Sequence, residues 1–142
     1  MAFTYGSIWG DYGDEKVTGT TQLHPMGTRM VLPDGRVFYY GQTDGAQTAG
    51  AICRSAVSVA NHDMDLATNT ASAGDKSVTV TVGGTAATED QYKDGYLYVN
   101  DGTGEGHIYK IRQHDAISSS GSGAINLYDG DAIAVAFAAA TI

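Results

Sequence analysis

The sequence predicts an all-β protein, a single compact β-sandwich or barrel that is jelly-roll-like and has about eight short strands, with an extended N-terminal arm. Two observations support this prediction. The chain of 142 residues holds 19 glycines and nine tyrosines but only two prolines, a composition that favours short strands joined by tight turns. Several runs also alternate between apolar and polar residues, which is the period of a half-buried strand. We expect the arm at residues 1–26 and the β-domain at residues 27–142.

The predicted arm is rich in glycine and in isolated aromatic residues, and it follows neither the helical nor the strand period. A loose terminus is one interpretation of such a segment. Disordered segments are, however, depleted in aromatic residues, so we favour an arm that docks on a partner through its large apolar side chains. The residues expected to make this contact are Phe3, Tyr5, Ile8, Trp9 and Tyr12.

The clearest predicted elements are two hairpins. Residues 28–32 and 36–40 are β-rich and flank a Pro-Asp-Gly turn, whose proline presets φ and whose glycine accepts a positive φ. Residues 96–100 and 106–112 flank the glycine-rich loop 101–105 in the same way. Each pair therefore predicts two antiparallel strands joined by a short connection.

Shorter patterns predict the remaining elements. Residues 77–82 alternate strictly between Thr or Ser and Val, which predicts a strand with one wet face. Thr88, followed three residues later by Gln91, matches a capping box. The other expectations, in chain order, are a weak strand at 51–59, a surface loop at 61–75, one helical turn at 89–93, a flexible linker at 118–123 and strands at 124–128 and 132–137.

No pattern indicates catalysis or a bound metal. The glycine-rich run 102–106 resembles half of a phosphate-binding loop, but a strand follows it where a helix is needed. The four histidines have no metal-ligand spacing, and no nucleophile elbow is present. The acidic loops 101–105 and 129–131 lack the spacing of a calcium loop and are typical of turns. We therefore expect no enzyme activity, cofactor or metal, and we expect the single cysteine, Cys53, to be a small buried side chain.

The charge of the chain bears on its partners. The formal net charge is −8 and the eight basic residues are scattered, which argues against binding to nucleic acid. The N-terminus lacks the pattern of a signal peptide, and no run approaches the roughly 18 apolar residues that span a bilayer. The sequence therefore predicts a soluble protein that is made in the cytoplasm and has no membrane contact.

The C-terminal run 132–142 is apolar apart from Thr141. In a monomer such an end strand promotes aggregation, whereas in an oligomer it forms an interface. We favour the interface and expect Ile133, Val135 and Phe137 to contribute to it.

Two blocks of the sequence resemble a known family. Residues 27–40, which read Gly-Thr-Arg-Met-Val-Leu-Pro-Asp-Gly-Arg-Val-Phe-Tyr-Tyr, and residues 94–111 are similar to blocks found in the same order in tailed-bacteriophage virion structural proteins. The resemblance extends over residues 27–134. It implies a capsid decoration (cement) protein on the outer capsid surface of the virion, made in the host bacterial cytoplasm. It also implies the major capsid protein as a partner, and a homotrimer near three-fold positions that stabilises contacts between capsid subunits.

Members of that family carry further C-terminal sequence after the strand Leu127-Tyr128-Asp129, whereas this sequence stops soon afterwards. This difference favours a compact, capsid-bound form over host attachment. The alternative is a tail, neck or head-fibre structural protein with a glycan- or host-binding role. Carbohydrate binding needs an exposed row of aromatic rings, for which Tyr96, Tyr98 and Tyr109 are the candidates.

Overall fold

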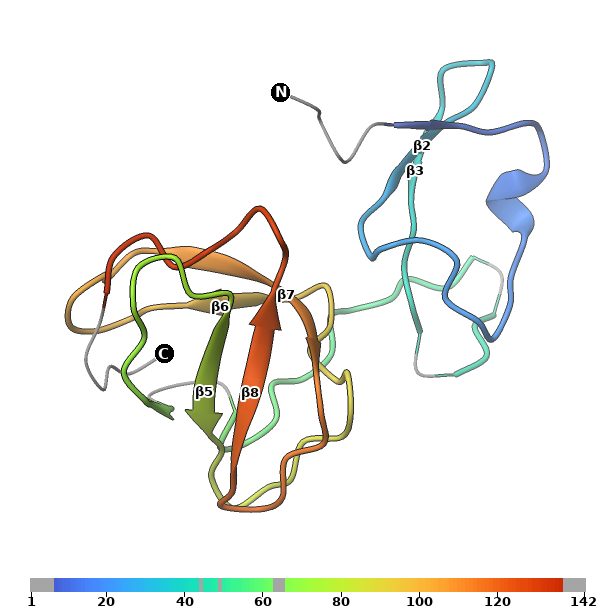
Figure 1. Cartoon of the computed structure of the whole chain (residues 1–142). Helices are drawn as coiled ribbons and strands as arrows, with labels where there is room; N and C mark the ends of the chain where they lie inside the picture. The colour runs from blue at the N-terminus through green and yellow to red at the C-terminus, as the bar shows by residue number, and fades with distance from the viewer. Residues whose placement is uncertain (1–6, 44, 49, 63–65, 137–142) are drawn as a thin grey trace. The chain divides into compact units, whose positions relative to one another are not determined.

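The computed structural model describes residues 7–43, 45–48, 50–62 and 66–136. Over these residues the protein is all-β, as predicted, with eight short strands and one 3-10 turn, η1. The chain divides into two compact units (Figure 1), which we call unit 1, Met1–Arg54, and unit 2, Ser55–Ile142. No helix in the described ranges has the length and apolar character needed to cross a membrane.

Unit 1 contains a three-stranded sheet in the order β1-β2-β3. Strand β1 (Ile8–Trp9) pairs in parallel with β2 (Arg29–Val31), which pairs antiparallel with β3 (Val37–Tyr39). The first predicted hairpin is thus confirmed, and Gly35 has the positive φ, 84°, that its turn requires. The turn η1 (Asp14–Lys16) lies in the connection between β1 and β2.

The division between the units falls after Arg54 and not after residue 26. The first hairpin was expected in the β-domain, but it pairs with the N-terminal segment through β1. Within the described part of the arm, β1 is therefore a strand of a small sheet, while residues 17–26 contain no strand or helix.

Unit 2 contains a five-stranded antiparallel sheet in the order β4-β5-β8-β7-β6, which curls into a half-barrel (Figure 1). The second predicted hairpin and the predicted strands near 77–82 and 124–128 are confirmed. The strands are β4 (Ala67–Thr68), β5 (Ser77–Thr81), β6 (Tyr96–Tyr98), β7 (Ile108–His114) and β8 (Ser122–Leu127).

The core of unit 2 lies on the inner face of this curled sheet. Strand β5 shows the reason, because Val78 and Val80 are buried while the intervening Thr79 is half-buried on the other face. Alternation of this kind places every second residue of a strand on one face. The buried cluster consists of Ala71, Val78, Val80, Val82, Ala87, Leu97, Val99, Tyr109, Ile111, Ile117, Ile125, Leu127 and Ile133.

Two predicted strands do not form in the described residues. Residues 51–59 contain no strand and are almost entirely exposed, including Cys53, whose thiol lies 3.3 Å from Gln47 Oε1. Residues 132–136 also contain no strand. The backbone of Ile133 instead bonds to two loop residues, because its N–H donates to Asp75 O and its carbonyl accepts from Gly74 N–H.

Two predicted loops and one predicted helical turn need correction. The expected surface loop 61–75 contains β4 and the buried Ala71. The expected flexible linker 118–123 is a tight turn that runs into β8, and an added Cβ at Gly123 would lie 2.5 Å from Ile117 Cγ1. Residues 89–93 form successive turns without a helix, although Gln91 Oε1 accepts the Thr88 N–H at 2.9 Å, which is one half of the predicted capping box.

Candidate functional site

The first candidate site is an exposed apolar row on unit 1. Residues Trp9, Val31 and Val37 are paired across β1, β2 and β3, and paired residues of neighbouring strands point to the same face. Tyr39 lies on the same face, two residues after Val37 on β3 and opposite Arg29 of β2. Trp9 is 78% exposed and Tyr39 is 69% exposed, while Val31, which lies between Trp9 and Val37 in the row, is buried. We call Trp9, Val37 and Tyr39 the aromatic face.

The opposite face of the same sheet is better covered. Ile8, Met30 and Phe38 form the next row across the three strands, and all three are half-buried. A sheet of three strands usually buries its more apolar side chains. The aromatic face therefore leaves a tryptophan and a tyrosine exposed that burial against a partner would cover.

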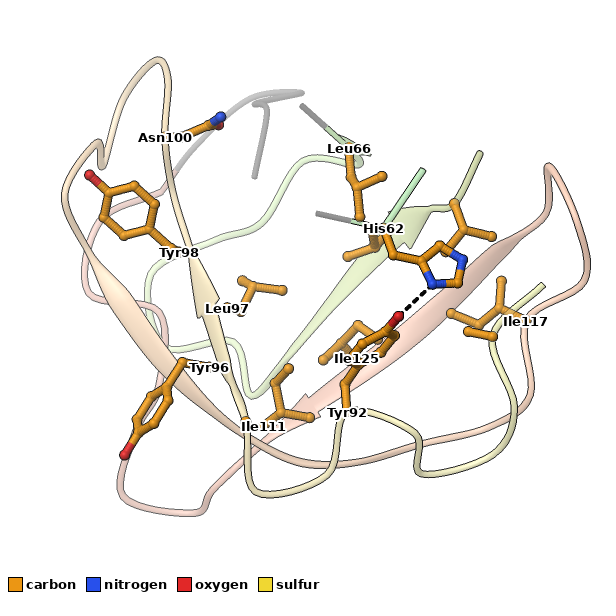
Figure 2. A pocket seen from close by; sticks show the side chains of 14 residues that line it. His62, Leu66, Tyr92, Tyr96, Leu97, Tyr98, Asn100, Ile111, Ile117 and Ile125 are labelled. Carbon is orange, nitrogen blue, oxygen red and sulfur yellow. Dashed lines mark hydrogen bonds between the residues drawn. The ribbon is translucent and has the colours of Figure 1, made fainter. Parts of the chain in front are cut away.

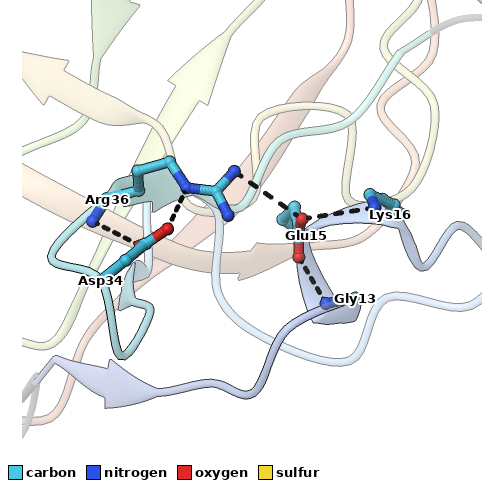
Figure 3. Close-up of polar contacts among 5 residues, drawn as sticks. All are labelled: Gly13, Glu15, Lys16, Asp34 and Arg36. Carbon is cyan, nitrogen blue, oxygen red and sulfur yellow. Dashed lines mark hydrogen bonds and ion pairs between the residues drawn. The ribbon is translucent and has the colours of Figure 1, made fainter.

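Polar contacts hold the segments beside the aromatic face (Figure 3). Asp34 Oδ2 accepts from Arg36 Nε at 2.7 Å, and its Oδ1 accepts from the Arg36 N–H at 3.1 Å. Arg36 Nη1 also lies 3.9 Å from Glu15 Oε1. These contacts connect the β2–β3 turn to η1, which follows β1 in the chain.

The pKa values of this group follow from its hydrogen bonds. The Gly13 N–H donates to Glu15 Oε2 at 2.7 Å, and this bond lowers the pKa of the Glu15 carboxyl below its ordinary value of 4.5. The side-chain bond from Arg36 lowers the pKa of Asp34 below 3.8, and the same bond raises the pKa of Arg36. Both carboxyl groups are therefore held in their ionised form.

The predicted interface residues fall into separate places. Trp9 and Tyr12 are exposed on unit 1, whereas Ile8 is half-buried on the opposite face of the sheet from Trp9. Val135 is 42% exposed on unit 2, but Ile133 is buried in the core of its own unit and offers no surface to a partner. The remaining three, Phe3, Tyr5 and Phe137, lie outside the described residues.

Sequence reasoning missed Val37 and Tyr39. Both belong to a hairpin that was predicted, but the strand around them carries apolar residues on both faces, Phe38 and Tyr40 among them. A strand of this kind gives no signal for which face is exposed. The pairing of β2 with β1 and β3 shows that Val37 shares a face with Trp9.

The second candidate site is a pocket of about 390 Å³ on the inner face of unit 2 (Figure 2). Its walls come from β5, β6, β7 and β8 and from the segments before β4 and β6. Figure 2 shows the side chains of Leu97, Ile111 and Ile125 directed into it, while the rings of Tyr96 and Tyr98 point away. The lining residues are His62, Leu66, Val80, Val82, Ala87, Tyr92, Gly95, Tyr96, Leu97, Tyr98, Asn100, Ile111, Ile117 and Ile125.

One polar pair lies in the pocket wall. His62 Nδ1 is 2.5 Å from the Tyr92 hydroxyl and His62 Nε2 is 2.8 Å from Thr85 O. Since a carbonyl only accepts, Nε2 donates to Thr85 O, while Nδ1 pairs with the Tyr92 hydroxyl. Tyr92 also stacks on the buried ring of His114, with 5.8 Å between ring centroids.

The third candidate is the outer face of the β6–β7 hairpin. Tyr96, Tyr98 and Ile108 are exposed there, and the Lys110 ammonium lies 5.7 Å from the ring centroid of Tyr96. Tyr109 is only 3% exposed, because it points to the inner face. The row of three tyrosines considered for carbohydrate binding is therefore reduced to two.

The described ranges contain no group of three or more His, Cys, Asp and Glu side chains close enough to hold a metal ion. No family model, curated protein or solved structure matches the chain. The virion family and the absence of enzyme activity thus stay predictions from the sequence.

Proposed function

We propose that this chain is a capsid decoration (cement) protein, which binds the outer surface of a phage head and stabilises contacts between major capsid protein subunits. The observation that carries the proposal is the aromatic face, with Trp9 and Tyr39 exposed on a paired sheet. Tryptophan and tyrosine dominate the binding energy of protein interfaces. Held on a sheet, they lose little conformational freedom when they bind. The resemblance of residues 27–134 to virion proteins points in the same direction.

The distribution of charge supports unit 1 as the binding unit. Residues 1–54 hold five acidic and four basic residues, whereas residues 55–142 hold eleven acidic and four basic residues. Nearly all of the net charge of −8 therefore belongs to unit 2. A unit with little net charge meets little long-range repulsion when it approaches a partner, whereas a strongly acidic one stays soluble and resists non-specific association.

The strength of the contact follows from its area. Each large apolar side chain that becomes buried contributes roughly 1.5–3 kcal/mol, and association itself costs several kcal/mol. One copy with two aromatic anchors therefore binds a shell weakly. A homotrimer that presents three such faces gains affinity through effective concentration, so we propose the trimer as the bound form and capsid subunits around a three-fold position as its partners.

Copy number in purified particles tests this function. A cement protein occupies many equivalent positions on the shell, so quantitative mass spectrometry is expected to find the chain in numbers comparable to those of the major capsid protein. A few copies per particle, located at the tail or neck, would overturn the proposal. Heat resistance of particles with and without the chain is the second readout, since binding to the intact shell raises its stability by mass action.

A second function is favoured by the outer face of the β6–β7 hairpin. Tyr96 and Tyr98 share one face of β6 there, beside Lys110, and exposed aromatic rings with nearby polar groups suit the apolar faces of sugars. On this alternative the chain is a tail, neck or head-fibre component that binds glycans. Tyr96→Ser would then abolish retention on a glycan array, whereas Trp9→Ser would leave it unchanged.

A further inference from the structure

The pocket of unit 2 has no part in the proposed contact with a capsid, and it is large enough for a ligand. Its volume is about 390 Å³. A cavity of about 150 Å³ lined by aliphatic and aromatic side chains binds benzene, and small-molecule sites range from about 300 to 1,000 Å³. The pocket therefore has room for a molecule larger than a single ring.

The lining makes the pocket apolar. Val80, Ile111 and Ile125 come from β5, β7 and β8 respectively, and each is at most 5% exposed. Leu97 of β6 completes the wall on the side of the second hairpin (Figure 2). These strands are hydrogen-bonded neighbours in one sheet, so the walls are held by the fold itself and the pocket is pre-formed.

The described wall of the pocket offers no partner to a charged ligand. Among the described residues, no Asp, Glu, Lys or Arg lines the pocket. The ring nitrogens of His62 are both engaged, Nδ1 with the Tyr92 hydroxyl and Nε2 with Thr85 O. A charged group that entered the pocket would lose its hydration without gaining a counter-charge, which costs several kcal/mol.

From the volume, the apolar walls and the lack of a counter-charge among the described lining residues, we infer that unit 2 binds an uncharged, apolar small molecule of about two to three aromatic rings or an equivalent length of alkyl chain. All of its described lining residues belong to unit 2. Its ligand is recognised by shape and by burial of apolar area, at about 25 cal/mol per Å².

Two fluorescent probes with one ring skeleton test this inference on the full chain. N-phenyl-1-naphthylamine is uncharged, and 1-anilinonaphthalene-8-sulfonate adds a sulfonate to the same rings. The uncharged probe is expected to show a saturable rise in fluorescence at one site per chain. The sulfonate is expected to bind at least about tenfold more weakly, because tenfold corresponds to only 1.4 kcal/mol of the cost of burying its charge.

Variants place the probe in the pocket. Ala87→Leu adds volume to a buried lining residue, and Leu66→Trp narrows the pocket from a partly buried position beside the core cluster. Each is expected to weaken the uncharged probe at least about tenfold. Ala124→Leu, an exposed position on β8, is the matched control and is expected to bind as the wild type does.

Thermal unfolding of each variant shows whether it is folded. If Ala87→Leu has a lower thermal unfolding midpoint than the wild type, the test relies on Leu66→Trp, because Leu66 is less deeply packed and its replacement disturbs the core less. Absence of saturable binding of the uncharged probe to the full chain would overturn the inference. Equal affinity for the two probes, or wild-type affinity in a folded Leu66→Trp variant, would overturn it as well.

Discussion

Gly123 lies on β8 where an added side chain has no room. A Cβ there would lie 2.5 Å from Ile117 Cγ1 and 2.7 Å from its Cδ1, and Ile117 is itself buried in the core of unit 2. The glycine thus allows the turn 118–121 to fold back closely over the sheet. Its role is close packing, since its backbone has no positive φ.

Replacement of this residue is expected to destabilise unit 2. Gly123→Ala should lower the free energy of unfolding by roughly 1–3 kcal/mol, which is the usual cost of overpacking a core, as measured by urea unfolding followed by circular dichroism. Gly130→Ala is the matched control, because no described atom lies within 4 Å of an added Cβ there. Its effect should stay within about 0.5 kcal/mol. Equal effects of the two substitutions would show that the packing around Gly123 is wrong.

Glu15 gives unit 1 a dependence on pH. Its pKa in the folded state lies below 4.5, so the folded state favours the ionised carboxyl more than the unfolded state does. This stabilisation is fully present above about pH 4.5 and is lost as the pH falls through the lower, folded value. Asp34, whose pKa also lies below its ordinary value, acts in the same direction at somewhat lower pH.

Glu15→Gln should therefore flatten the loss of stability of unit 1 in acid. Hydrogen exchange of the Gly10 N–H, which donates to Val31 O at 3.0 Å, reports the opening of this sheet. Between pH 5 and pH 3 its protection should fall less in the variant than in the wild type. Glu105→Gln on unit 2 controls for the loss of one negative charge. An unchanged slope in Glu15→Gln would contradict the assignment of this carboxyl.

Among the elements, β5 shows how a period of two becomes a stable strand. Val78→Ala, at a side chain that is 2% exposed, should cost about 2 kcal/mol of unfolding free energy, because it removes buried methyl groups and leaves a cavity. Thr79→Ala, on the opposite face of the same strand, should change the unfolding free energy by less than about 0.5 kcal/mol. Chemical denaturation of the three proteins measures both. A register shifted by one residue would reverse the two results.

The sequence predicted those elements whose partners lie close along the chain. Both hairpins carry their turn residues and their β-rich runs within about fifteen residues, so local pattern and pairing agree. The run 132–136 has a strand-like composition too, but strand formation depends on an available partner. Ile133 finds loop residues Gly74 and Asp75 in place of a strand, and it is buried there.

The candidate sites were predictable only in part. Trp9 and Tyr12 are exposed, which agrees with aromatic residues available to a partner. The row that joins Trp9 to Val37, however, depends on the parallel pairing of β1 with β2. This pairing connects residues about twenty positions apart, which no local pattern predicts. The pocket is harder still to predict from the sequence, because its lining residues look like ordinary core residues there. No local signal distinguishes a residue that fills a core from one that lines a hollow in it.

For the whole molecule, the division into two units has a consequence that truncation tests. The entire buried cluster of unit 2 lies between Ala71 and Ile133, and its sheet uses strands from that unit alone. A fragment of residues 55–142 should therefore fold by itself and unfold in one cooperative transition. Its amide NMR spectrum should retain the dispersed signals of β5 to β8. A collapsed spectrum without dispersion would show that unit 2 depends on unit 1.

The contrast in charge also belongs to the whole molecule. Since unit 2 holds eleven of the 16 acidic residues, two free copies repel one another mainly through unit 2. In the proposed cement role, this repulsion acts between neighbouring copies on the shell. Salt screens the repulsion between exposed charges that lie further apart than the Debye length, about 8 Å at physiological ionic strength, so occupancy of a crowded shell should rise modestly with ionic strength.

The most direct test of the central claim is an add-back experiment on phage heads stripped of this chain. The wild type is compared with Trp9→Ser/Tyr39→Ser, which removes both rings of the aromatic face, and with Tyr96→Ser/Tyr98→Ser as a control that removes two exposed rings of unit 2. The wild type and the control should bind many sites per head and raise its heat resistance. Trp9→Ser/Tyr39→Ser should bind at least about 30-fold more weakly than the wild type, which corresponds to a loss of about 2 kcal/mol of binding free energy. Binding of this variant at wild-type affinity, or no binding of the wild type to heads, would contradict the account.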